Sequence, residues 1–131
     1  MIVSKNNPIG WIEIPVTDME RAMTFYQTVF GLTCERHQMG PLDMAFFPII
    51  ENGKGSSGAL VRHQTWYKPS LTDGPLVYFT AASGDLRNEL ARVESAGGKI
   101  HIPRKQISEE YGYMAVFEDT EGNRIAVHSR K

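Results

Sequence analysis

The chain has 131 residues, 41% of them hydrophobic and 22% charged, a composition typical of one globular domain and not of a disordered or fibrous protein. Fourteen Lys and Arg against fifteen Asp and Glu give a net charge of −1, and no basic stripe suits a nucleic-acid backbone. One cysteine excludes a disulfide scaffold, and no apolar run is long enough for a membrane span. We therefore expect a cytoplasmic protein with no nucleic-acid or membrane partner.

The first predicted elements are a strand and a helix. Residues 8–16 alternate or run apolar over strand length. Thr17-Asp18-Met19-Glu20 is a capping-box pattern, in which the Thr17 hydroxyl accepts a helix N–H and Glu20 reaches back to the cap. Apolar residues then follow at spacings of three and four up to Phe30, and Gly31 is typical of a helix end.

Three strand-like runs follow this helix, over residues 32–38, 42–49 and 57–63. A linker over residues 64–74 contains Trp66-Tyr67-Lys68-Pro69, which could cover a cleft or contact a partner. The second half then predicts a strand over 75–81, a weaker helix capped by Ser83 or Asp85 and closed by Gly97-Gly98, and strands over 99–107, 113–118 and 123–129.

The two halves repeat one another. Ala59 corresponds to Ala126, and Pro8 to Pro75, at an offset of 67 residues. Each half reads β-α-β-β-β, and about 60 residues are too few to bury both a helix face and a sheet face well. We predict a single α+β domain over residues 1–131, with repeats at about 8–63 and 75–129. The repeats are expected to form an open, curved eight-stranded mixed sheet or half-barrel with a central cleft.

Two motifs carry a family resemblance. The first is Ile12-Glu13-Ile14-Pro15-Val16-x-Asp18-Met19-Glu20-Arg21-Ala22-x-x-Phe25-Tyr26-x-x-Val29-Phe30-Gly31, and the second is Glu118-Asp119-Thr120-Glu121-Gly122-Asn123-Arg124-Ile125. With the tandem repeat, they resemble the vicinal oxygen chelate superfamily, which includes glyoxalase I, extradiol dioxygenases and the fosfomycin- and bleomycin-resistance proteins. The resemblance spans about residues 8–129, and the branch it is most similar to is that of predicted enzymes related to lactoylglutathione lyase. It implies a small molecule in the cleft and a homodimer.

The resemblance also implies where a metal ion would bind. Metal-dependent members hold a divalent ion with donors from the first and last strands of each half. The matching positions here are Trp11, Ala59, Val77 or Tyr78, and Ala126. None of these is a good ligand for a divalent ion. We therefore expect no metal at the family positions, and a divalent metal is a cofactor that only the resemblance suggests.

Other residues could build a site in the cleft. Strand alternation places Glu13 on the face of Trp11, and His128 on the face of Ala126. Glu13 and His128 are therefore candidate catalytic residues, as an acid–base pair or as displaced metal ligands. The alternative is structural, with Glu13 satisfying a hydrogen bond and His128 lying near a frayed terminus. Flat apolar walls for a ligand are expected from the aromatic residues of the strands, Trp11, Phe46, Tyr78, Phe79 and Tyr113.

These observations favour a glyoxalase-like protein that binds a small molecule without the usual metal ligands. The alternative is a divalent-metal-dependent lyase or isomerase of the lactoylglutathione lyase type with a non-standard site. Whether the chain is an enzyme stays open, and so does the identity of its ligand.

Overall fold

The structure is a computed structural model that describes residues 5–131. The first half contains β1 (Ile12–Pro15), α1 (Met19–Phe30), β2 (Glu35–Met39), β3 (Leu42–Phe46) and β4 (Gly58–Arg62). The second half contains β5 (Val77–Thr80), α2 (Leu86–Leu90), β6 (Lys99–Ser108), β7 (Gly112–Glu118) and β8 (Arg124–Ser129). The two tandem β-α-β-β-β modules predicted from the sequence are confirmed, with every element in the expected order.

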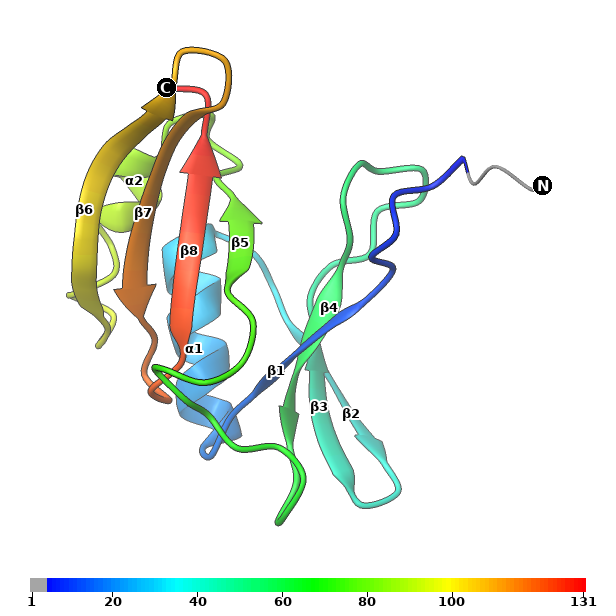
Figure 1. Cartoon of the computed structure of the whole chain (residues 1–131). Coiled ribbons are helices and arrows are strands. Elements are labelled where there is room, and N and C mark those ends of the chain that lie inside the picture. Colours follow the sequence, from blue (N-terminus) through cyan, green and yellow to red (C-terminus); the bar gives the residue numbers. More distant parts are fainter. Residues whose placement is uncertain (1–4) are drawn as a thin grey trace.

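Each module forms its own four-stranded mixed sheet. The strand orders are β1-β4-β3-β2 and β5-β8-β7-β6. In both sheets the first strand pairs in parallel with the last, and the other pairs are antiparallel. Figure 1 shows the two sheets standing apart, with the edge strands β1 and β5 on the sides that face each other. The arrangement is open, without a closed barrel.

The two modules share one hydrophobic core around the helices. α1 contacts its own sheet through β3 and β4, and it also contacts α2. Its Phe30 ring stacks on Phe79 of β5, with 4.4 Å between the ring centroids, and its Phe25 ring lies 5.9 Å from that of Phe117 in β7. Because the helix-facing side of each sheet is in this core, the other side of each sheet faces outward.

The start of α1 differs from the predicted capping box. Asp18, not Thr17, is the N-cap, and its side chain accepts from the Arg21 backbone N at 3.1 Å. Glu20 pairs instead with Arg36. Glu121, from the β7–β8 turn, takes the expected role of Glu20, because its Oε1 accepts from the backbone N of Asp18 at 2.8 Å. A buried carboxylate from the second module therefore completes the cap, whereas the exposed Glu20 is drawn to an arginine.

The second helix is shorter than predicted. α2 ends at Leu90, and the chain continues through irregular turns to Gly97, with bonds such as Val93 N to Leu90 O at 3.2 Å. Hydrogen bonds between residues three apart, in place of four, give a tighter turn that is seen only in short segments. Asp85 is the N-cap, whereas the Ser83 hydroxyl donates to the buried carboxylate of Glu89 at 2.8 Å.

Candidate functional site

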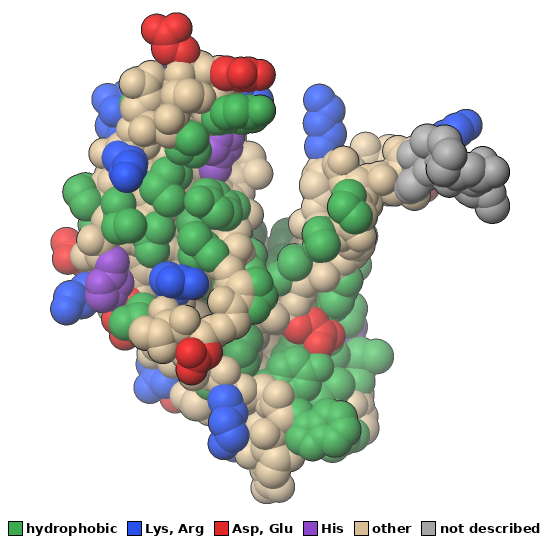
Figure 2. Space-filling view, viewed as in Figure 1, with side chains coloured by type: hydrophobic (Ala, Val, Ile, Leu, Met, Phe, Trp, Pro, Cys, Tyr) green, Lys and Arg blue, Asp and Glu red, His purple; other side chains and the backbone are tan. Residues whose placement is uncertain are grey.

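A groove lies at the seam between the two modules, and its volume is about 290 Å³. Figure 2 shows the molecule hollowed between its two sheets. The lining comes from β1, from the linker, and from the β5 and β8 regions: Glu13, Ile14, Pro15, Trp66, Tyr67, Lys68, Ser70, Asp73, Gly74, Pro75, Val77, Asn123, Arg124 and Ile125. Both modules and the linker are therefore needed to form it.

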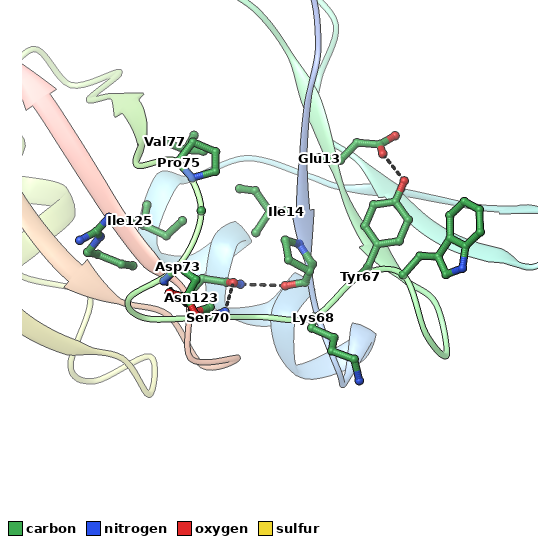
Figure 3. A pocket seen from close by; sticks show the side chains of 14 residues that line it. Glu13, Ile14, Tyr67, Lys68, Ser70, Asp73, Pro75, Val77, Asn123 and Ile125 are labelled. Atoms are coloured by element: carbon green, nitrogen blue, oxygen red, sulfur yellow. Dashed lines mark hydrogen bonds between the residues drawn. The ribbon is translucent and has the colours of Figure 1, made fainter.

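Glu13 holds the linker against the first sheet. The Tyr67 hydroxyl donates to Glu13 Oε1 at 2.5 Å, and Trp11 Nε1 donates to Oε2 at 3.2 Å. Figure 3 shows the Tyr67 ring reaching Glu13 from the linker. The hydrogen bond to Glu13 raises the pKa of Tyr67, so this phenol keeps its proton near neutral pH. Both carboxylate oxygens are engaged, and Glu13 here acts as a clamp for one wall of the groove.

Asn123 connects the parts of the opposite wall. Its Nδ2 donates to the Pro15 carbonyl at 2.7 Å, and its Oδ1 accepts from the Ser70 backbone N at 3.3 Å. Its own backbone N donates to Asp119 Oδ1 at 2.9 Å. The end of β1, the linker and the β7–β8 turn are thereby tied to one side chain, as the dashed lines in Figure 3 show in part.

Two buried acids lie beneath this wall. Burial raises the pKa of Asp119, although it accepts hydrogen bonds from Asn123 and from the Tyr26 hydroxyl, the latter at 2.5 Å. Burial acts on Glu121 in the same direction, but the bonds from Arg21 and its other donors outweigh it and bring the pKa of Glu121 down to about 2. Glu121 is therefore ionised at neutral pH. It links the two modules and does not line the groove.

The predicted ligand-binding aromatic residues lie in different surroundings. Trp11 packs edge-on against Phe46, with ring centroids 5.3 Å apart, on the outward face of the first sheet. Tyr78 is on the outward face of the second sheet and is 51% exposed. Phe79 and Tyr113 are both partly buried and pack against the shared core, and the Arg104 guanidinium lies 3.7 Å from the Tyr113 ring centroid. None of the five lines the groove.

The structure does not bring Glu13 and His128 together. Glu13 lies on β1 of the first sheet and lines the groove. His128 lies near the end of β8 in the second sheet, where its Nε2 bonds to the carbonyl oxygen of Tyr111 in the β6–β7 turn. The two side chains share no contact, so one chain does not form the predicted acid–base pair.

Strand register decides which residue stands at the ambiguous metal position. Tyr78 pairs with Ala126, just as Glu13 pairs with Ala59, whereas Val77 pairs with Ile125 and faces the core side. Tyr78 therefore shares the outward face with Ala126, and by register its counterpart in the first module is Glu13, two residues after Trp11.

The side chains at these positions do not fit a divalent ion. Ala59 and Ala126 are fully buried and offer only methyl groups, and Trp11 offers an indole whose N–H already donates to Glu13. Within residues 5–131 there is also no group of three or more His, Cys, Asp or Glu side chains that could hold a metal ion.

Sequence reasoning missed the polar residues of the groove. Asn123 and Arg124 stand within the second family motif, but nothing in their spacing indicated a ligand wall. Ser70 carried no signal at all. Trp66, Tyr67 and Lys68 were expected to cover a cleft or meet a partner, and the structure places all three along the groove.

Comparison with protein families gives a match over almost the whole chain. The model described as Glyoxalase/Bleomycin resistance protein/Dioxygenase superfamily matches residues 8–127. A comparison with curated protein sequences found no match. In the part of the chain that the structure describes, no helix is both long and apolar enough to cross a membrane, and α1 has only 12 residues.

Several solved structures share the fold. A glyoxylase/bleomycin resistance protein/dioxygenase domain from Frankia sp. EAN1pec is 17% identical, with a TM-score of 0.72, 95% of this chain covered and 98% of that one. The antibiotic-binding protein TnmS3 from Streptomyces sp. CB03234 is 20% identical, with a TM-score of 0.63 and coverages of 98% and 100%. Glyoxalase I from Zea mays is 17% identical, with a TM-score of 0.68. The match covers 94% of this chain but only 46% of the maize chain, so this chain spans about half the length of the maize protein. At these identities the likeness shows the fold alone.

Proposed function

Since this chain belongs to the glyoxalase/bleomycin resistance protein/dioxygenase superfamily, we propose that it binds a small molecule in the groove between its modules, without a metal at the family positions. The observation that carries the proposal is the groove itself, which both modules and the linker build. The antibiotic-binding protein TnmS3, which has the same fold, supports a binding role for this architecture.

The lining of the groove suits a small ligand with an apolar body and a polar group. Ile14, Pro15, Val77 and Ile125 supply aliphatic surface, whereas Ser70, Asp73, Asn123 and Arg124 supply polar groups. Small-molecule sites combine apolar walls with a few fixed polar groups, and their volumes run from about 300 to 1,000 Å³. The volume of about 290 Å³ favours a ligand at the small end of that range.

The surroundings of the reactive side chains favour binding over catalysis. Both oxygens of Glu13 accept hydrogen bonds, from Tyr67 and Trp11, and so hold the linker against the first sheet. A nucleophilic cysteine needs a thiolate, but Cys34 is buried, and burial raises its pKa to about 11. We therefore propose no catalytic role for Glu13 or Cys34.

A ligand screen followed by mapping tests the proposal. Compounds that raise the melting temperature in a thermal-shift screen are added to labelled protein, and amide chemical shifts are recorded. We expect the shifts to cluster at Ile14, Ser70, Val77 and Asn123. In Val77→Phe a larger side chain occupies the groove, so the response is expected to fall.

The matched control is Tyr78→Phe, at the next position on the opposite face of β5. It should leave both the thermal shift and the amide map unchanged, because Tyr78 does not line the groove. Loss of binding in Tyr78→Phe with binding retained in Val77→Phe would move the ligand to the outward face of the second sheet. A screen with no hit contradicts the proposal.

The homodimer implied by the family is part of the same proposal. Figure 2 shows hydrophobic side chains gathered on the outward face of the second sheet, where Tyr78 is 51% and Ile102 39% exposed. Contiguous apolar surface of this kind is typical of an interface. Sedimentation velocity is expected to give a species of twice the chain mass, and a single species of the chain mass would contradict the dimer.

A further inference from the structure

Arg124 differs from the other arginines of the described chain. Each of the others has a partner for its guanidinium: Arg21 with Glu121, Arg36 with Glu20 and Asp43, Arg62 with the Thr17 carbonyl, Arg87 with Asp85, Arg92 with the Val29 carbonyl, Arg104 with the Tyr113 ring, and Arg130 with the Glu110 carbonyl. Within residues 5–131, the Arg124 side chain makes no hydrogen bond or ion pair. Its Nε is shielded from solvent without a partner, as is the Nε of Arg104, but the Arg104 guanidinium has the Tyr113 ring as a partner. A buried N–H without a partner costs free energy.

The acids near Arg124 do not satisfy it. Glu118 is its cross-strand neighbour, but Glu118 Oε1 bonds to His101 Nε2 at 2.9 Å. Glu13 also lines the groove, and both of its oxygens are engaged by Tyr67 and Trp11. Asp73 lines the groove as an exposed side chain and makes no ion pair among the described residues. The positive charge of Arg124 is therefore available to a ligand in the groove.

We propose that the groove binds a small organic acid, with the carboxylate on the guanidinium of Arg124 and the apolar body against Pro15 and Val77. This inference rests on the proposed function and names the chemical class of its ligand. A guanidinium presents donors in a planar fork that matches the two oxygens of a carboxylate. Because Nε is shielded from solvent, the two Nη atoms would form this fork.

Arg124, and not Lys68, is the anchor. Lys68 is the other cation of the groove, but its side chain is exposed, whereas Arg124 is half-buried beside the linker, with its backbone N donating to the Ser70 carbonyl at 3.4 Å. A charge that is partly removed from water interacts more strongly with an opposite charge than an exposed one does. Lys68 therefore serves as the matched control for the loss of one positive charge in the same groove.

The test uses matched acids and amides that share one apolar body. Benzoate, phenylacetate and 3-phenylpropanoate are compared with benzamide, phenylacetamide and 3-phenylpropanamide by amide chemical-shift titration of the full chain. A charge-assisted hydrogen bond contributes about 1.5–3 kcal/mol, so at least one acid is expected to bind about tenfold or more tightly than its amide. Its shifts should cluster at Val77, Asn123, Arg124 and Ile125.

Variants separate Arg124 from general charge. Arg124→Gln should remove the preference for the acid over its amide, and Arg124→Lys should keep only part of it, because an ammonium lacks the fork. Lys68→Gln should leave the preference within about twofold. Asp73→Asn should strengthen acid binding, because it removes a nearby negative charge. Melting temperatures of all four variants confirm that each is folded.

Each outcome decides the inference. Equal binding of acids and amides in the groove overturns it and leaves the proposed function intact. An acid preference that persists in both Arg124 variants also overturns the inference. Loss of the preference in Lys68→Gln would show that Lys68, and not Arg124, binds the carboxylate. If neither acids nor amides shift the groove resonances but the wider screen finds other ligands there, only the organic-acid class is wrong. If the wider screen also finds no ligand, the proposed function is wrong as well.

Discussion

Glu121 has the largest number of polar partners of any side chain described here, and they come mostly from the other module. Its carboxylate accepts from the backbone N atoms of Thr17 and Asp18, at 2.9 and 2.8 Å, and from the Arg21 guanidinium at 2.8 Å. The Glu121 side chain is fully buried, whereas that of Arg21 is half-exposed. One residue of the β7–β8 turn thus completes the N-terminus of α1 and joins the two modules.

The first prediction concerns Glu121→Gln. The pKa of Glu121 falls from 4.5 to about 2 on folding, so its contribution is fully present above pH 4.5 and is lost as the pH falls toward 2. A shift of this size corresponds to about 3 kcal/mol. We expect the variant to be less stable at pH 7 by about that amount and to lose the pH dependence between 4.5 and 2, measured by urea unfolding.

A matched control removes a carboxylate that does not join the modules. Glu51 is exposed in the loop before β4, so Glu51→Gln should keep the wild-type stability and the wild-type acid dependence. Asp119 acts with the opposite sign, because burial raises its pKa and its protonation in acid favours the folded state. If Glu121→Gln keeps the wild-type loss of stability between pH 4.5 and 2, that loss comes from other groups.

At the scale of elements, the pairing of β1 with β4 depends on a glycine. Gly58 pairs with Ile12, and a Cβ placed on Gly58 would lie 2.1 Å from the Ile12 carbonyl oxygen. Real Cβ atoms do not approach backbone that closely, so no side chain fits without moving a strand. β1 has only 4 residues and carries Glu13 and Pro15 into the groove. A displaced β1 would therefore disturb the site as well as the sheet.

The second prediction concerns Gly58→Ala. We expect a loss of about 2–4 kcal/mol in the free energy of unfolding, because the added methyl group forces the two strands apart. The control is Gly10→Ala just before β1, where an added Cβ meets nothing within 4 Å and the loss should stay under about 0.5 kcal/mol. Similar losses in the two variants would show that strand spacing does not explain the effect. Denaturant midpoints measure both.

At the scale of the molecule, the shared core makes the modules dependent on each other. Phe79 of the second module lies among aromatic rings of the first and stacks on Phe30. Its ring centroid is 5.6 Å from that of Tyr26 and 5.5 Å from that of Phe47. Glu121 and Asn123 add polar links across the same boundary. The seam that forms the groove is therefore held by both apolar packing and hydrogen bonds.

The third prediction concerns Phe79→Ala, which removes a ring at this boundary. We expect a loss of about 3 kcal/mol and a single cooperative transition in which both modules lose stability together. Trp11 and Trp66 fluorescence reports on the first module and the linker, and amide exchange in β7 and β8 reports on the second. Protection lost in β7 and β8 alone would show independent modules. Ile107→Ala, at an exposed position of β6, is the control and should change little.

The sequence predicted the order of the elements and the tandem repeat, because hydrophobic periodicity and turn residues are local properties of the chain. Gly31 ended α1 as expected, since its left-handed conformation, with φ 65°, favours glycine. Strand alternation also grouped residues by face correctly, placing Glu13 with Trp11 and His128 with Ala126.

Only the tertiary structure decided which groups meet. Alternation cannot say which face of a strand meets the helices, so Phe79 was expected in a ligand wall but packs against the shared core. A local motif also cannot reveal a competitor distant in sequence, which is why Glu20 was expected at the cap that Glu121 occupies. The groove between β1, the linker and β8 exists only when the two modules pack together. The same packing places Arg124, which has no side-chain partner among the described residues, in the lining of the groove.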